Sequence, residues 1–533
     1  MQSLENSVST RAADLAQLES QDWDLVVIGG GISGAGVAQQ AAAQGWRVLL
    51  VEQQDFAWGS SSRSSKLVHG GLRYLAQGDV ATTWHSVRER QRLLREAPAL
   101  VQPQGFLQPL YQGRAPGRWP MQLGLALYDR MAGQRSQRFV GAAAAQQLAP
   151  GLAPAGLQGA LLFQDAKTDD ARLVLRVLQA AQQLGATALN YLAATALQLH
   201  QGRVAGLQLH DRLSGQRYAV RARAIVNATG AWADGLRASL GAPPLLRPLR
   251  GSHLVLPFWR LPLAYSVSLM HPGDGRPVFF YPWEGALLVG TTDLDHRSPL
   301  AQEASITAAE RDYLLAAVNG AFASARIGAA DVQACYAGVR PVVADGHAQA
   351  SQARREHVVR DESGLITLTG GKLTTFRLMA QDALALAAAH VGRPFVRSPA
   401  PVLAPASPLP GRWGARRCQR LQARYGAQAG TWCANAPDEL LDCVPGSDTL
   451  WLELALAARH EAVQHLDDLL LRRTRLGLLL PQGALALLPQ VRSLCAPLLG
   501  WDAARWRQEA QRYRALVAAH YQLPDGPALP KYE

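Results

Sequence analysis

A glycine-rich turn near residue 30 constrains the fold of this chain more than any other feature of its sequence. Residues 29–34 read GGGISG, which has the spacing GxGxxG, and they follow the apolar segment 25–28, which predicts a buried strand. The alanine-rich residues 33–44 predict a helix, and residues 46–51 predict a second strand. This order of elements is typical of dinucleotide binding, because the glycines permit a tight turn, a close pyrophosphate and close packing of helix on strand.

An acidic residue at the end of the second predicted strand supports this interpretation. Glu52 follows Gly34 by 18 residues, and a carboxylate at that place can accept hydrogen bonds from a ribose. The alternative is a glycine-rich turn in an ordinary α/β unit that holds no ligand. The motif alone does not distinguish NAD from FAD.

The rest of the chain divides into a mixed region and a helical region. The hydrophobic pattern predicts helices at 79–96, 169–184 and 373–390, a three-stranded meander at 187–224, and further strands at 225–228, 250–295 and 365–368. Six prolines between positions 394 and 410 predict an extended linker. Residues 411–533 are rich in leucine, alanine and arginine at helical spacing and predict a separate helical domain.

The composition excludes several classes of protein. With 48% apolar residues, the 533-residue chain is neither disordered nor a disulfide scaffold, and its five cysteines show no CxxC pair and no metal-ligand spacing, which fits a reducing compartment. The net charge of +12 fits anionic partners or simply a solvated basic surface, and no basic run or recognition module indicates nucleic acid. The sequence predicts neither a signal peptide nor a transmembrane helix, so any membrane role is expected to be peripheral.

A second unusual segment follows the glycine-rich turn. Residues 60–75 read SSSRSSKLVHGGLRYL, and their small side chains permit the backbone to approach a large ligand closely. By composition alone, a mobile serine-rich loop is an equal alternative. Lys66 in this segment and Lys372 in the turn 370–372 are two of only four lysines among 53 basic residues.

These two segments match one family when they are taken together with seven others. The others are DDARLVL (169–175), NATGAW (227–232), GSHLV (251–255), VGTTD (289–293), GVRP (338–341), GGKLTTFR (370–377) and HLDDLLLRRTRLGLL (465–479). In these segments the chain resembles the FAD-dependent, quinone-linked glycerol-3-phosphate dehydrogenases, which belong to the flavoprotein group of the D-amino-acid and glycine oxidases. The resemblance extends over residues 22–480 and is weak at 400–455.

The resemblance implies an α/β fold with three domains. These are a discontinuous, Rossmann-like FAD-binding domain, a substrate domain with a mixed β-sheet, and a helical C-terminal domain. In chain order, the expected parts are an N-terminal extension (1–21), FAD-binding segments (22–75, 165–245, 340–395), substrate-domain segments (76–164, 246–339), a proline-rich linker (396–410) and the helical domain (411–533).

The resemblance also implies which residues hold the cofactor. They belong to the glycine-rich turn, the serine-rich segment and two later turns: Gly29, Gly31, Ile32, Ser33, Gly34, Glu52, Ser64, Ser65, Lys66, Leu67, His69, Gly70, Gly71, Thr229, Gly230, Gly371, Lys372, Leu373, Thr374 and Thr375. A helix N-terminus after the turn 370–372 would place partial positive charge beside the flavin N1–C2=O edge and favour its reduced form. The alternative at that turn is an ordinary strand-to-helix connection.

Glycerol 3-phosphate makes separate demands on its site. Its phosphate needs fixed cationic donors, for which the resemblance implies Arg340 and Arg73, with Tyr74, Thr291 and Lys372 as supporting contacts. Its C2 hydroxyl must lose a proton, and we expect His253 to be the base, which makes His253, Arg340 and Lys372 the expected catalytic residues. Against this, the chain has 49 arginines, and most of them are expected to be surface residues.

The implied activity is the oxidation of sn-glycerol 3-phosphate to dihydroxyacetone phosphate, by hydride transfer to flavin N5, with the electrons passed to a membrane quinone. The expected place is the cytoplasm, at the inner face of the cell membrane, and a homodimer is left open as the assembly. The alternative is a flavin oxidase of the same fold, acting on glycerol 3-phosphate or an amino acid and producing hydrogen peroxide. A non-catalytic nucleotide-binding protein is an alternative of another class.

Two further segments have competing interpretations. Residues 114–131 combine arginines and aromatic residues with an apolar helix, which suits a membrane interface, but the pattern favours a helix packed within the substrate domain. His460 and His465 suggest a zinc-binding helix, but a spacing of five places them on different faces of a helix. The sequence therefore predicts no metal site.

Overall fold

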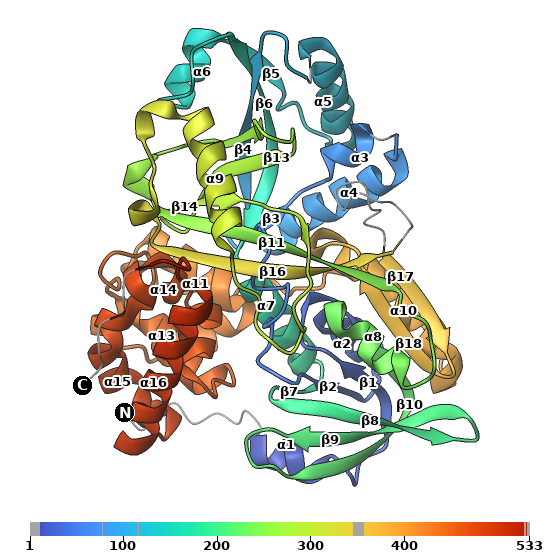
Figure 1. The fold of residues 1–533 in the computed structure, drawn as a ribbon. Coiled ribbons are helices and arrows are strands. Elements are labelled where there is room, and N and C mark those ends of the chain that lie inside the picture. Colours follow the sequence, from blue (N-terminus) through green and yellow to red (C-terminus); the bar gives the residue numbers. More distant parts are fainter. Residues whose placement is uncertain (1–10, 77, 116, 345–356, 527–528, 530–533) are drawn as a thin grey trace.

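The computed structural model describes residues 11–76, 78–115, 117–344, 357–526 and 529, with the exception of the side chains of Arg73 and Ala76. Two sheets lie one above the other in Figure 1, and a group of helices from the C-terminal part of the chain lies beside both. The α/β fold class predicted from the sequence is confirmed.

The first sheet has eight strands around a parallel core. Its order is β17-β18-β10-β1-β2-β7, and β10 also continues into the antiparallel pair β9 and β8. The bounds are β1 (Trp23–Ile28), β2 (Val48–Val51), β7 (Thr187–Leu189), β8 (Leu192–His200), β9 (Arg203–Asp211), β10 (Arg217–Asn227), β17 (His357–Glu362) and β18 (Leu365–Gly370). The strands β1 and β2 are apolar throughout except Asp24 and buried on both faces, as is usual for parallel strands.

The two faces of this parallel core are covered by different elements. Leu25, Val27, Leu50 and Val226 pack against three helices: α2 (Ile32–Ala42), α7 (Asp170–Gln183) and α10 (Phe376–Val391). The alternate residues, such as Val26 and Leu49, pack instead against the β8–β9–β10 meander. The strand period of two therefore sends neighbouring residues into two separate cores.

The second sheet has ten strands and is mostly antiparallel. Its order is β15-β11-β14-β13-β12-β4-β6-β3, with β16 paired to β11 and β5 paired to β6. The bounds are β3 (Leu67–Val68), β4 (Val101–Tyr111), β5 (Arg138–Gly141), β6 (Leu157–Thr168), β11 (Leu246–Pro257), β12 (Ser266–Met270), β13 (Pro277–Trp283), β14 (Ala286–Gly290), β15 (Leu294–Asp295) and β16 (Ala334–Val343).

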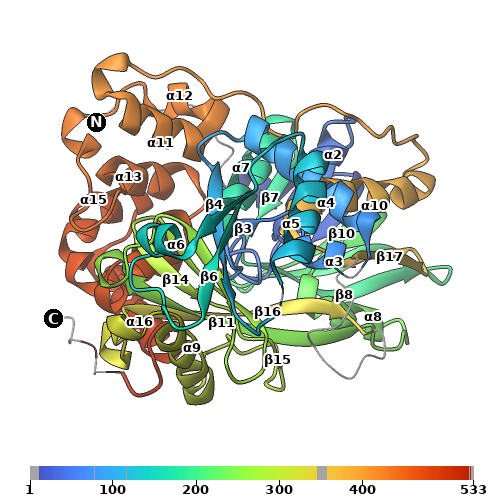
Figure 2. The same cartoon turned by 90° about the horizontal axis from the view of Figure 1, so that it is seen from above.

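The remaining helices lie around the sheets or form the C-terminal group. Around the sheets lie α1 (Arg11–Gln17), α3 (Leu72–Ala76), α4 (Val80–Glu96), α5 (Arg118–Ala132), α6 (Ala142–Leu148), α8 (Ala233–Ala238) and α9 (Ala308–Ala321). The C-terminal group contains α11 (Ala415–Tyr425), α12 (Ala429–Cys433), α13 (Trp451–His460), α14 (Leu476–Leu479), α15 (Leu488–Leu499) and α16 (Ala503–His520). Figure 2 shows this group along one side of the molecule.

Several local predictions differ from the structure in their bounds. The strand predicted at 225–228 is the end of the long strand β10, because the meander runs without a break into the parallel core. The helix α10 begins at Phe376, after a 3-10 turn at Leu373–Thr375, and not directly after the glycine turn. The helix α13 ends at His460, so His460 and His465 do not share a helix.

Candidate active site

One large cavity lies between the two sheets at the carboxyl ends of β1 and β10. Its volume is about 1430 Å³, which is above the roughly 300–1,000 Å³ of common ligand pockets. The lining contains residues of the glycine-rich turn, the serine-rich segment and both sheets. The carboxyl end of a parallel sheet is the usual place for a ligand in this class of fold.

The glycine-rich turn has the geometry that its sequence predicted. Gly29 has a φ of 113°, which favours glycine, and a Cβ on Gly34 would lie 1.9 Å from the carbonyl oxygen of Gly29. A Cβ on Gly31 would lie 3.1 Å from Ser61 Oγ, a tight contact that Ser61 would have to relieve by a small shift, but it would meet no backbone atom. Gly29 and Gly34 therefore serve the packing of α2, while Gly31 keeps the cavity open at the N-terminus of that helix.

Glu52 is held at the end of β2 beside this turn. Its carboxylate accepts hydrogen bonds from the backbone N–H groups of Gly30, at 2.7 Å, and Gln54, at 2.9 Å. Burial raises the pKa of Glu52, and the two backbone donors oppose this shift. Glu52 lines the cavity, so its carboxylate can also meet a ligand there.

Most of the predicted cofactor residues line the same cavity. Those that do are Gly29, Gly31, Ile32, Ser33, Glu52, Ser64, Ser65, Leu67, His69, Gly71, Thr229, Gly230, Gly371, Lys372, Leu373 and Thr374. Four do not line it: Gly34, Lys66, Gly70 and Thr375. Gly70 packs instead against Tyr128, whose hydroxyl oxygen accepts its N–H at 2.8 Å.

Lys66, which the resemblance implied as a cofactor residue, does not line the cavity. Its side chain is fully buried behind the cavity, and its ammonium donates to the Ser62 carbonyl oxygen at 2.9 Å and to Asp170 at 3.1 Å. Burial lowers its pKa to about 8, despite the attraction of Asp170. A carboxylate partner inside the protein therefore accounts for this lysine better than a ligand does.

The predicted substrate residues include two cations that line the cavity, Arg340 and Lys372, and Arg340 is ion-paired there with Asp293. Arg340 donates to Asp293 and to Thr291, both at 2.9 Å. The Lys372 ammonium lies 3.6 Å from the centre of the Tyr74 ring and donates to Ser86 Oγ at 3.2 Å. Arg340, Thr291, Asp293, Lys372 and Tyr74 all line the cavity. The side chain of Arg73, which was also predicted, lies outside the described residues.

His253 lies behind the lining and not on it. Its Nε2 atom lies 2.9 Å from Ser65 Oγ, its ring stacks on Tyr336 at 4.7 Å, and its Nδ1 atom is buried without a hydrogen-bond partner in the described part of the chain. Burial and the positive charges of Arg340 and Lys66 hold its pKa well below its usual range. His253 is therefore neutral near pH 7, and Ser65 separates it from the cavity.

The structure adds residues that the sequence did not single out. Asp293, His271, Arg276 and Trp58 line the cavity. Asp293 ends the VGTTD segment, so its partnership with Arg340 could have been suspected from the sequence. His271 and Arg276 carry no local pattern, because only the folding of β12 and β13 brings them to the rim.

The lining fits a dinucleotide and offers nothing for a metal ion. The cavity includes the N-terminus of α2, where the helix dipole can stabilise a pyrophosphate, and its lining also contains apolar residues such as Leu67 and Leu373. Within the described ranges, no group of three or more His, Cys, Asp or Glu side chains could hold a metal ion.

Comparisons with known proteins agree with this geometry. A family model described as FAD dependent oxidoreductase matches residues 24–395, and one described as the C-terminal domain of alpha-glycerophosphate oxidase matches residues 366–506. A glycerol-3-phosphate dehydrogenase of Mycobacterium leprae is 35% identical, over 96% of this chain and 90% of its own. An aerobic glycerol-3-phosphate dehydrogenase of Staphylococcus saprophyticus is 38% identical, over 68% of this chain and 67% of its own.

Solved structures show the same architecture. The glycerol-3-phosphate dehydrogenase of Bacillus halodurans, complexed with FAD, aligns with a TM-score of 0.73 and 27% identity, over 95% of this chain and 96% of its own. The glycine oxidase of Geobacillus kaustophilus aligns with a TM-score of 0.52 and 19% identity, over 72% of this chain, and shares the fold.

Proposed function

The chain belongs to the family of FAD-dependent oxidoreductases, and on this basis we propose that it oxidises sn-glycerol 3-phosphate to dihydroxyacetone phosphate. The observation that carries the proposal is one cavity whose lining includes the glycine-rich turn, Arg340 and Lys372. The two relatives described above, both glycerol-3-phosphate dehydrogenases by name, support the choice of substrate. Addition of glycerol 3-phosphate to the flavin-bound protein without air tests it, because a substrate must bleach the flavin.

The cofactor site uses residues from several parts of the chain. Gly31, Ile32 and the N-terminus of α2 would hold the pyrophosphate, and Glu52 would accept hydrogen bonds from the ribose. FAD, when bound, supplies flavin N5 as the acceptor for a hydride from C2 of the substrate. The roles of the individual residues are our proposal.

Arg340 and Lys372 are the residues that we propose to bind the phosphate of the substrate. A dianion needs fixed donors, and the guanidinium of Arg340 is fixed by its hydrogen bonds to Asp293 and Thr291. The Lys372 ammonium, held over the Tyr74 ring, adds a second positive charge on the same cavity. Arg73 stays a prediction for the same role.

The C2 hydroxyl proton leaves through Ser65. Ser65 lines the cavity, and its hydroxyl lies within hydrogen-bonding distance of His253 Nε2. His253 is neutral because its pKa is depressed, and with its own proton on Nδ1 it can accept at Nε2. His253, the base expected from the sequence, would thus receive the proton through Ser65 without contacting the substrate.

The acceptor of the electrons is proposed to be a membrane quinone. Oxidation of the substrate releases two electrons and two protons, and a quinone that takes up both becomes a quinol. Molecular oxygen, which becomes hydrogen peroxide, is the alternative acceptor, and the matched oxidase domain gives it a specific basis. Measurement of peroxide against quinol formed per substrate oxidised separates the two. A homodimer stays a prediction.

The outer face of α5 supports a place at the membrane surface. Residues at spacing four are strongly exposed there: Trp119 (72%), Leu123 (74%) and Leu127 (41%). Arg118 lies against Trp119, and Arg130 is exposed at the end of the helix. Exposed apolar and basic side chains on one helix are typical of binding to an anionic membrane surface.

The two sequence interpretations of residues 114–131, a helix packed within the substrate domain and a helix at a membrane interface, apply to different sides of α5. Only one side of α5 is packed, through Leu125, Tyr128 and Met131. Among the described residues, no helix combines the length and apolar character needed to cross a membrane. Peripheral association at the inner face of the cell membrane is our proposal.

We expect replacement of Trp119, Leu123 and Leu127 by Gln to weaken binding to vesicles that contain anionic lipid. The loss should be at least about tenfold, because each apolar side chain contributes about 1.5–3 kcal/mol when it is fully buried. Flotation with vesicles measures the effect. The matched control is Trp259→Gln, which removes an equally exposed aromatic side chain (74%) from another element and should bind as the native protein does. Native binding by the triple variant would exclude this face.

A further inference from the structure

Three buried arginines of the C-terminal helical group contact the segment that forms one side of the cofactor cavity. Arg472, Arg473 and Arg475 are at most 1% exposed. Their partners lie at the two ends of the segment 55–66, whose residues Trp58–Ser61 and Arg63–Ser65 line the cavity. The arginines of the C-terminal helical group thus contact a segment of the cavity wall that precedes them by more than four hundred residues in the chain.

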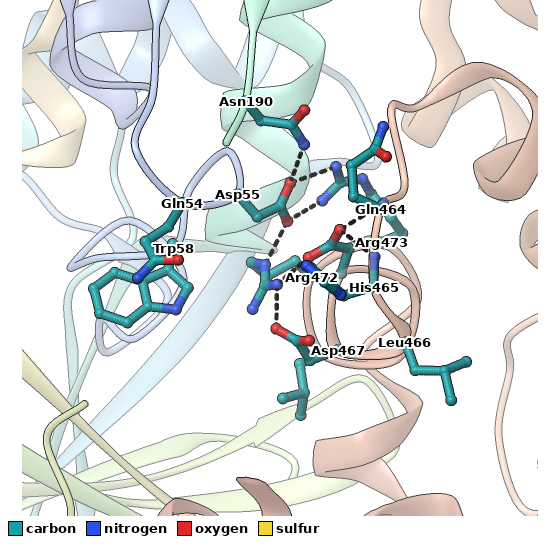
Figure 3. A network of polar contacts seen from close by, with 12 residues as sticks. Gln54, Asp55, Trp58, Asn190, Gln464, His465, Leu466, Asp467, Arg472 and Arg473 are labelled. Carbon is teal, nitrogen blue, oxygen red and sulfur yellow. Dashed lines mark hydrogen bonds and ion pairs between the residues drawn. The ribbon is translucent and has the colours of Figure 1, made fainter. Parts of the chain in front are cut away.

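The first end of this segment is fixed at Asp55. Figure 3 shows its carboxylate between Asn190 and the two arginines. Arg472 Nε and Arg473 Nη1 both donate to Asp55 Oδ2 at 2.5 Å, and Arg473 Nη2 donates to Oδ1 at 2.8 Å. Asp55 follows Glu52 by three residues, so this contact fixes the chain directly after the carboxylate proposed for the ribose.

The second end is fixed by Arg475. Its guanidinium donates to the Ser62 carbonyl oxygen at 3.3 Å, to Asp169 at 2.9 Å, and to Asp170. Asp170 in turn accepts the backbone N–H of Ser64 at 3.0 Å and the Ser64 hydroxyl at 2.7 Å. Arg475 therefore acts on the cavity lining both directly, through Ser62, and indirectly, through Asp170.

The next residue connects this contact with the proton path. Ser65 follows Ser64, and its hydroxyl bonds to His253 Nε2. The Tyr336 hydroxyl donates to the Ser64 carbonyl oxygen at 3.0 Å, and the same ring stacks on His253. Any movement of Ser64 would therefore change the placement of both Ser65 and His253.

We propose that Arg475 is a positioning residue and that the C-terminal helical domain is an integral part of the cofactor site. Buried ion pairs contribute little net stability, because desolvation offsets their attraction, but they fix geometry. Here the geometry that they fix is that of the segment 55–66. The proposal rests on the FAD site proposed above and is independent of the identity of the substrate.

The test compares the full-length protein with the variant Arg475→Lys. Lysine keeps the charge but cannot contact Ser62, Asp169 and Asp170 together. In the protein freed of flavin, we expect amide hydrogen exchange of residues 58–66 to accelerate about tenfold, the effect of losing a hydrogen bond to a charged group. Titration with FAD should show binding weaker by about tenfold for the same reason.

Arg176→Lys is the matched control. Arg176 is also a buried arginine between the same two domains, but it donates to the Ala423 carbonyl oxygen, at 2.6 Å, and does not contact the segment 55–66. In the Arg176→Lys variant, the amides of residues 58–66 should exchange at the native rate, and FAD should bind with native affinity. Equal effects of both variants, or native exchange and FAD affinity in Arg475→Lys, would overturn the proposal.

A measurement on the native protein covers the case in which Arg475→Lys does not fold. Coupling between two sites is reciprocal, so FAD binding must also slow the amide hydrogen exchange of the segment that contains the three arginines. Residues 469–475 should exchange more slowly with FAD bound than without it, while residues 503–520 of α16 should not change. Unchanged exchange of residues 469–475 on FAD binding would contradict the proposal.

Discussion

Gly31→Val is expected to give folded protein that retains no FAD. A Cβ at this position lies 3.1 Å from Ser61 Oγ and meets no backbone atom, so the fold should survive the substitution with a small shift of the Ser61 side chain. The two methyl groups of valine would, however, occupy the cavity at the N-terminus of α2, where the pyrophosphate must approach the backbone. The visible absorbance of the protein after desalting measures the bound flavin, and circular dichroism measures the fold.

Gly124→Val provides the matched control for this variant. Gly124 lies in α5, and a Cβ there meets nothing within 4 Å. We expect Gly124→Val to retain FAD as the native protein does. Stoichiometric FAD in Gly31→Val would show that the glycine-rich turn does not hold the pyrophosphate.

His253→Asn is expected to slow flavin reduction by glycerol 3-phosphate by about two to four powers of ten, the usual contribution of a base. FAD content and substrate affinity should change far less, because neither Arg340 nor the glycine-rich turn is altered. Stopped-flow reduction without air measures the rate. His390→Asn is the control, since His390 lies at the end of α10, where it pairs with Asp361, and does not line the cavity.

The pH dependence of the same rate tests the path through Ser65. Burial lowers the pKa of His253, so its neutral form persists below the ordinary histidine value of about 6.5. The rate of flavin reduction should therefore fall only well below pH 6.5 in the native protein. Ser65→Ala should slow reduction although His253 is intact. A native rate in both His253→Asn and Ser65→Ala would place the base elsewhere.

Local patterns predicted the first βαβ unit, and they singled out the glycine-rich turn and the serine-rich segment, both of which contribute residues to the cavity lining. The turn at residues 29–34, Glu52 and the serine-rich segment are near one another in sequence, so their chemistry is visible in one stretch. The resemblance added Thr229, Thr291, Arg340 and Lys372, which lie far apart in the chain but line the same cavity. Fold class, family and FAD as the cofactor were predicted correctly.

Other features depend on contacts between distant segments, which no local pattern records. The partner of Lys66 is Asp170, 104 residues away, so a buried ion pair could not be distinguished from a ligand contact. The separation of His253 from the cavity depends on Ser65, which lies 188 residues away in the chain. The apolar residues of α5 showed a helix, but only packing decided which of them are exposed.

Arg340 is the residue that ties the proposed substrate to the structure. Arg340→Lys keeps the charge but loses the planar fork, so kcat/KM for glycerol 3-phosphate should fall about ten- to a hundredfold, as expected for hydrogen bonds to a charged group. FAD content should be unchanged. Glycerol, which lacks the phosphate, should be a poor substrate for both forms, and an equal response of both substrates to the mutation would remove Arg340 from phosphate binding.

The most direct test of the proposed function is a titration of the native, flavin-bound protein with glycerol 3-phosphate in the absence of air, followed by visible absorbance. We expect glycerol 3-phosphate to bleach the oxidised flavin and dihydroxyacetone phosphate to form in equal amount, while the same concentration of glycerol leaves the spectrum unchanged. A flavin that stays oxidised with glycerol 3-phosphate, or that glycerol bleaches equally well, would contradict the proposed function.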